Sequence, residues 1–162
     1  MMLKDIPFTQ YPYLPHIVRD TLAGAKDEFV LTGSRFAGTY KPHSDWDFFV
    51  RRWPGLKEFL MEVGFKSMST FDDPEGTDYN GVDDPANYTV DVLQHKSEPV
   101  QIQVVTDIKH AVATRDLVYT VLKDKDMQLH MSDETTRRKL WCQAAAVIAT
   151  AMGIHHYDKG GW

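Results

Sequence analysis

Apolar residues recur along this chain at two spacings, one typical of amphipathic helices and one typical of short strands. Helical spacing predicts helices over residues 15–25, 54–64 and 107–122, and a last helix from Ser132 or Asp133 to Gly153. Runs of β-branched and aromatic residues predict strands at 29–32, 47–51, 88–94 and 100–105. The four residues 96–99 suit a hairpin between the last two strands, which we therefore expect to be antiparallel. This order predicts an α+β fold, with a small mixed β-sheet backed by helices.

One polar stretch, residues 71–87, interrupts this pattern because it is rich in Asp, Gly, Pro and Asn. Such a composition is typical of a solvated loop, and we expect a flexible acidic loop that can close over a substrate. No repeat or low-complexity segment occurs elsewhere. A chain of 162 residues fits one ordinary domain, so we predict that residues 1–162 form a single domain.

The composition narrows the function classes. No apolar stretch approaches the roughly 20 residues that cross a bilayer, so no membrane role is predicted. The amino-terminal residues lack the apolar core of a secretory signal, which favours the cytoplasm. The net charge of −5 argues against a protein that coats nucleic acid, because such binding depends on many Lys and Arg side chains. An acidic protein can still hold a nucleotide through Mg²⁺.

Two carboxylates stand at the start of the second predicted strand, in the run Asp45-Trp46-Asp47. Side chains two residues apart on a strand point to the same face, so Asp45 and Asp47 are expected to project together. Paired carboxylates repel each other unless a cation lies between them. Mg²⁺ prefers oxygen ligands and usually shares them with substrate phosphates, so the pair predicts a Mg²⁺ site.

A possible phosphate-binding turn, Gly33-Ser34, follows the first predicted strand and precedes Asp45 by ten intervening residues. Glycine lets the backbone approach a phosphate closely, and the Ser34 hydroxyl adds a hydrogen-bond donor. Arg35 is expected to add charge-assisted bonds to the same phosphates. Lys41 and Ser44 lie on the approach to the carboxylates and are weaker candidates for contact with a triphosphate.

Together, the Gly33-Ser34 turn, the gap and the strand-borne Asp45 and Asp47 resemble the signature of the DNA polymerase β-like nucleotidyltransferase superfamily. The resemblance covers residues 29–50 closely and extends to small phage-encoded members, whose location would be the host cytoplasm. It implies a polymerase β palm-like fold that moves a nucleoside monophosphate from an NTP to an acceptor hydroxyl (EC 2.7.7-type). It also implies two Mg²⁺ or Mn²⁺ ions held by three carboxylates.

The third carboxylate has two candidate positions. Asp91, flanked by apolar residues in a predicted strand, matches the expected setting and would join Asp45 and Asp47 as a catalytic metal ligand. The competing alignment places this position in the next strand, at Gln101 or Gln103. Glutamine is neutral and a poor substitute for a carboxylate at a metal, so that alignment implies weak, altered or absent catalysis.

Two functions therefore stay open. The first is an enzyme that uses an NTP and an unidentified acceptor, which could be tRNA, a protein or a small molecule. The second is a catalytically impaired nucleotidyltransferase fold that serves as a nucleotide- or macromolecule-binding module in phage–host conflict. Because no second domain is evident, a homo-oligomer could complete the substrate cleft; the sequence identifies neither the acceptor nor the preferred base.

Overall fold

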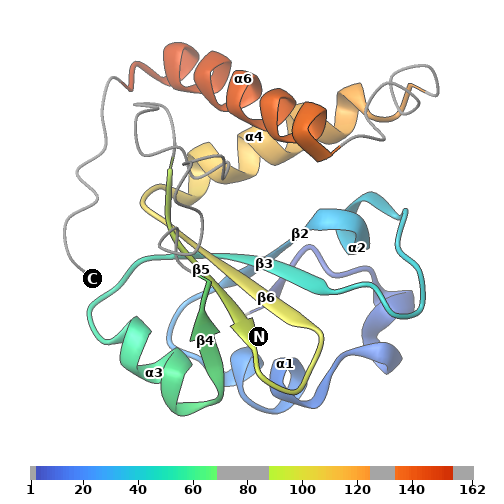
Figure 1. Ribbon diagram of the computed structural model, residues 1–162, viewed down its shortest axis with the longest axis vertical. Coiled ribbons are helices and arrows are strands. Elements are labelled where there is room, and N and C mark those ends of the chain that lie inside the picture. Colours follow the sequence, from blue (N-terminus) through green and yellow to red (C-terminus); the bar gives the residue numbers. More distant parts are fainter. Residues whose placement is uncertain (1–2, 69–87, 125–133, 155–162) are drawn as a thin grey trace. The chain divides into compact units, whose positions relative to one another are not determined.

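A computed structural model describes residues 3–68, 88–124 and 134–154 (Figure 1). It confirms the α+β class, with a mixed sheet of six strands and several helices. The chain forms two compact units. The first contains residues 3–68 and 90–105; the second contains 88–89, 106–124 and 134–154. The acidic loop predicted at 71–87 lies outside the described residues.

The sheet has the strand order β1-β2-β3-β6-β5-β4. Its central strands are mixed in direction, because β3 runs antiparallel to β2 and parallel to β6. The hairpin prediction places β5 beside β6, and the strand order confirms that the two are neighbours. The bounds are Leu3–Lys4 (β1), Phe29–Thr32 (β2), Trp46–Arg51 (β3), Phe65–Ser67 (β4), Thr89–His95 (β5) and Val100–Val105 (β6).

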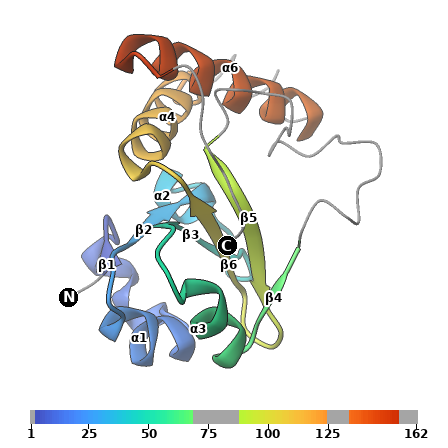
Figure 2. The same ribbon diagram turned by 90° about the vertical axis from the view of Figure 1, so that its left-hand side faces the viewer.

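One face of the sheet carries the core of the first unit. Trp46, Phe48 and Val50 alternate along β3 and are almost fully buried on this face. Helices α1 (His16–Asp20) and α3 (Leu56–Glu62) contribute apolar residues to the same cluster (Figure 2). We call this the core face. The side chains between these positions, including that of Asp47, therefore point to the opposite face.

Several short elements differ from the sequence prediction. The helix expected over 15–25 is divided into α1 and a 3-10 turn, η2 (Leu22–Gly24), because Thr21 leaves helical geometry with φ −123° and ψ −58°. The strands β1 and β4, the 3-10 helix η1 (Phe8–Tyr13) and the helical turn α2 (Gly33–Ala37) were not predicted. Each has six residues or fewer, too few for an apolar period to stand out.

The second unit is built on two helices, α4 (Ile108–Val121) and α6 (Glu134–Met152). Asp107 caps α4, because its side chain accepts hydrogen bonds from the backbone N–H groups of Lys109 and His110. The buried His110 ring joins the helices through a 2.7 Å hydrogen bond between Nε2 and the Ala145 carbonyl. Within the described ranges, no helix has the length and apolarity of a membrane span.

Candidate functional site

Gly33 and Asp47, the two halves of the sequence motif, are in direct contact. Gly33 has a φ of +70°, and a Cβ built on it would lie 2.2 Å from Oδ2 of Asp47. A Cβ at this position would force the Asp47 side chain to shift, and a left-handed φ also favours glycine. The contact follows from strand pairing, because Thr32, which precedes Gly33, lies opposite Asp47 in the β2–β3 ladder.

A row of three residues crosses the sheet at the level of Asp47. Thr32 of β2 and Gln101 of β6 are its direct partners on either side. Paired residues on neighbouring strands point to the same face, so all three side chains share the face opposite the core. The Thr32 hydroxyl is buried and has no hydrogen-bond partner among the described residues. The row therefore offers oxygen atoms beside the carboxylate.

Asp47 is partly buried, and its carboxyl group is electrostatically perturbed. Its pKa is raised from the ordinary 3.8 to about 7, mainly by burial and to a smaller extent by the nearby charge of Asp45. Asp45 itself is exposed and immediately precedes β3. A cation placed between the two carboxylates would relieve both effects, which is the electrostatic setting expected of a metal site.

The raised pKa predicts a pH-dependent stability in metal-free buffer. Folded Asp47 holds a proton up to about pH 7, whereas the unfolded group loses it near 3.8. The protonated Asp47 therefore makes its full contribution to the free energy of unfolding below about pH 4. That contribution is lost as the pH rises through 7. We expect the free energy of unfolding to fall in this window by up to about 1.4 kcal/mol per pH unit.

Urea unfolding in EDTA at several pH values checks this, with Asp47→Asn as the matched control because it cannot titrate. The difference between the two proteins should change with pH below 7 and level off above it. A difference that stays constant from pH 4 to pH 8 would contradict the raised pKa.

Three further motif residues lie in α2 and the loop between α2 and β3. Ser34 is partly buried, and its backbone carbonyl accepts hydrogen bonds from the backbone N–H groups of Gly38 and Thr39 at the end of α2. The Ser44 hydroxyl accepts a 2.8 Å bond from the backbone N–H of Lys41, which closes a turn. The Lys41 residue is exposed. Ser34 is next to Gly33, whereas the observed contacts of Ser44 stabilise the loop.

Arg35, predicted to contact phosphates, lies apart from the Asp45–Asp47 pair. It is 5% exposed, and Nη2 donates to the carbonyls of Pro42 and Ser44 at 3.3 and 3.1 Å. Its guanidinium carbon also lies 4.5 Å from the ring centres of both Tyr40 and Trp46. Because Trp46 faces the core side of β3, Arg35 is on the opposite side of the strand from Asp47. The phosphate contact predicted for Arg35 stays a prediction, and the guanidinium packs on the core-face side of β3 and not beside the carboxylates.

Asp91 also lies apart from Asp47. It is on β5, and β6 separates that strand from β3. It shares a face with Leu93, a core residue, so by alternation it points to the core face. Its carboxylate accepts hydrogen bonds from the Ser67 hydroxyl at 2.9 and 3.0 Å and from the Val92 N–H at 2.8 Å. The expected set of three carboxylates is therefore not formed through Asp91.

The alternative position is the one that borders Asp47. Gln101 is its partner on β6, and Gln103 lies two residues further along on the same face, opposite Phe49. The sequence raised both glutamines only as a competing alignment. The alignment through Asp91 needs β5 beside β3, whereas the alignment through Gln101 or Gln103 needs β6 there. The structure has β6 beside β3, and no local sequence pattern encodes which strand takes that place.

The residues present fit one Mg²⁺ ion and not a three-carboxylate centre. Among the described residues, no three His, Cys, Asp or Glu side chains group closely enough to hold a metal. Asp45 and Asp47 supply two carboxylates, and Thr32 supplies an unpartnered hydroxyl beside them. Mg²⁺ commonly takes one or two protein carboxylates and completes its shell with water and substrate phosphates.

Comparisons with protein-family models, curated proteins and solved structures each find no match to this chain.

Proposed function

We propose that this protein binds a nucleoside triphosphate together with Mg²⁺ at the corner formed by Gly33, Asp45 and Asp47. The site is nucleotidyltransferase-like, and its transfer chemistry is weak. The observation that carries the proposal is the contact between Gly33 and the Asp47 carboxylate, which brings the two halves of the motif to one point. Nothing larger than glycine would allow the turn and the carboxylate to approach so closely.

The electrostatics support a cation at this point. Burial and, after it, the charge of Asp45 raise the pKa of Asp47 to about 7, so its negative charge is disfavoured without a cation. Bound Mg²⁺ would neutralise the triphosphate and polarise its reacting phosphorus. The chain itself holds Asp47 against Gly33. It also presents the exposed Asp45 beside Asp47, where both carboxylates would hold the cation that binds the phosphates.

The residue beside Asp47 favours binding over efficient transfer. Gln101 is neutral where the resemblance implies a carboxylate, and Asp91 points to the other face of the sheet. A second candidate function is transfer of the nucleoside monophosphate to an acceptor hydroxyl. It is favoured by the exposure of Asp45, which leaves the carboxylate pair open to an approaching acceptor.

The Asp45→Asn/Asp47→Asn variant is expected to lose Mg²⁺-dependent NTP binding, with at least a tenfold rise in Kd. The reason is that two neutral amides replace the two carboxylates that attract the cation. Isothermal titration of each NTP, with Mg²⁺ and with EDTA, measures this loss. A matched control is Asp91→Asn, which changes a carboxylate on the other face and should leave the NTP affinity unchanged.

Each outcome of this titration has a defined meaning. Binding that requires Mg²⁺ and both Asp45 and Asp47 supports the proposal, and a pyrophosphate-release assay on the same samples separates binding from transfer. If wild-type protein bound no NTP in Mg²⁺, the proposal would be wrong. If the double variant bound as tightly as wild type, the site would lie elsewhere.

A further inference from the structure

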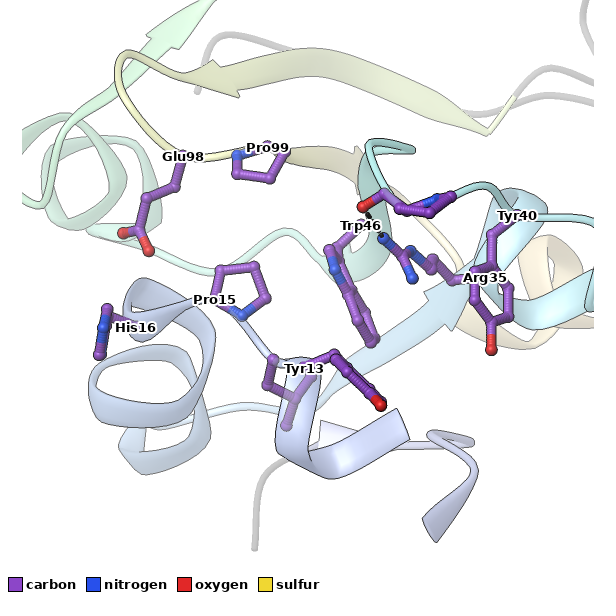
Figure 3. A pocket seen from close by; sticks show the side chains of 10 residues that line it. Tyr13, Pro15, His16, Arg35, Tyr40, Trp46, Glu98 and Pro99 are labelled. Atoms are coloured by element: carbon purple, nitrogen blue, oxygen red, sulfur yellow. Dashed lines mark hydrogen bonds between the residues drawn. The ribbon is translucent and has the colours of Figure 1, made fainter. Parts of the chain in front are cut away.

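A cavity of about 600 Å³ lies in the first unit, beside Trp46, the first residue of β3 (Figure 3). Its volume is within the range of roughly 300–1,000 Å³ that is typical of small-molecule sites. Rings make up most of its wall. Four are aromatic, counting the imidazole of His16, and three belong to prolines: Tyr13, His16, Tyr40, Trp46, Pro15, Pro42 and Pro99.

The cavity is distinct from the carboxylate corner. Trp46 forms part of its wall and points to the core face of β3, whereas Asp47, the next residue, points to the opposite face. Neither Asp45 nor Asp47 lines it. The proposed NTP site and this cavity therefore use opposite sides of one strand.

One end of the cavity carries a buried positive charge. Arg35 lines it, and the observed partners of the guanidinium are neutral: two backbone carbonyls and the faces of two rings. Its buried Nε has no hydrogen-bond acceptor among the described residues, and no described carboxylate forms an ion pair with it. A buried charge without a counter-charge is costly, so an anion at this end would stabilise it.

The opposite end of the cavity carries a carboxylate, that of Glu98. Both carboxylate oxygens of Glu98 accept hydrogen bonds from the backbone N–H of Ile17, at 3.3 and 3.1 Å. Figure 3 shows Glu98 and His16 at this end, with Trp46 between them and Arg35. A ligand with an anionic group is therefore oriented, because Glu98 repels the anion and Arg35 attracts it.

We propose that this cavity binds a planar aromatic ring that carries a carboxylate or phosphate group. The ring packs against the exposed side chain of Tyr13, because Arg35 already covers one face each of Tyr40 and Trp46. The anionic group lies at the Arg35 end, where it supplies the missing counter-charge. Aromatic walls favour a flat ring because stacking needs no precise hydrogen-bond geometry.

Two pairs of probes test the anion requirement: indole-3-acetate against its amide, and adenosine monophosphate against adenosine. Titrations are made by calorimetry in EDTA, since the Asp45–Asp47 corner has no cation there and repels anions. We expect the anionic member of at least one pair to bind about tenfold more tightly than the neutral member. The pair that shows the larger difference identifies carboxylate or phosphate as the preferred group, and equal affinity within both pairs would overturn the proposal.

Tyr13→Ala tests the aromatic wall, and Phe8→Ala is its matched control. Both residues lie in η1 and are strongly exposed, at 73% and 88%, but only Tyr13 lines the cavity. We expect Tyr13→Ala to weaken the anionic probe about tenfold, as loss of a stacking ring does, and Phe8→Ala to leave it unchanged. Equal effects of the two variants would rule out the cavity as the binding site. Unchanged Mg²⁺-dependent NTP binding in Tyr13→Ala would show that the two sites are separate, whereas its loss would contradict that separation.

Discussion

Replacement of Gly33 with alanine is expected to lower the free energy of unfolding by about 3 kcal/mol and to weaken Mg²⁺-dependent NTP binding at least tenfold. Two costs add together. A left-handed residue with a Cβ costs roughly 1–2 kcal/mol, and overpacking costs roughly 1–3 kcal/mol more. The second cost arises because the new Cβ would lie 2.2 Å from Oδ2 of Asp47. Urea unfolding and calorimetry on one preparation measure both effects.

Gly38→Ala is the matched control for this variant. Gly38 ends α2 with a φ of +81°, but nothing lies within 4 Å of a Cβ built there. Only the backbone cost of roughly 1–2 kcal/mol applies, and NTP binding should be retained. If Gly33→Ala and Gly38→Ala had the same stability and the same NTP affinity, the close approach of Gly33 to Asp47 would have no energetic role.

The second large effect expected is a gain of activity. Gln101→Asp should raise Mg²⁺-dependent pyrophosphate release from NTP on the order of 100-fold, with water as the acceptor. The variant places a third carboxylate beside Asp47, on the same face of the sheet. A well-held metal supplies several kcal/mol to such a reaction, and each 1.36 kcal/mol is a factor of ten in rate.

Gln103→Asp is the control for Gln101→Asp. It introduces the same side chain on the same strand and face, but opposite Phe49 instead of Asp47. Pyrophosphate release should stay at the wild-type rate. In EDTA, Gln101→Asp should also be less stable than wild type, because a further carboxylate then faces Asp47 without a cation. If wild type already released pyrophosphate as fast as Gln101→Asp, the protein would be an efficient enzyme and the proposed weakness of its chemistry would be wrong.

Gly33→Ala and Gln101→Asp test two different properties of the proposed site, its formation and its chemistry. Gly33→Ala asks whether the contact between the turn and Asp47 creates the binding site. Gln101→Asp asks whether the neighbouring strand limits the reaction. Binding that depends on Gly33, without any gain in Gln101→Asp, would leave a nucleotide-binding module whose lack of transfer has another cause.

Local pattern determined much of the fold of this protein. Phe29–Thr32 and Val100–Val105 are strands as predicted, and Asp107 caps α4, because strand propensity and capping act over a few neighbouring residues. The Asp45-Trp46-Asp47 run likewise placed the large ring and the second carboxylate on opposite faces of β3, since side chains alternate on any strand. The same run predicted a carboxylate pair from sequence alone.

Only the tertiary structure decided what lies beside that pair. Gly33 contacts Asp47 because β2 pairs with β3, and Gln101, not Asp91, is the neighbour of Asp47 because β6 lies between β3 and β5. Arg35 packs on Trp46 because α2 and its loop turn it to the core face. Strand order and loop packing depend on contacts between residues far apart in the chain. The spacing of residues along a sequence does not record such contacts.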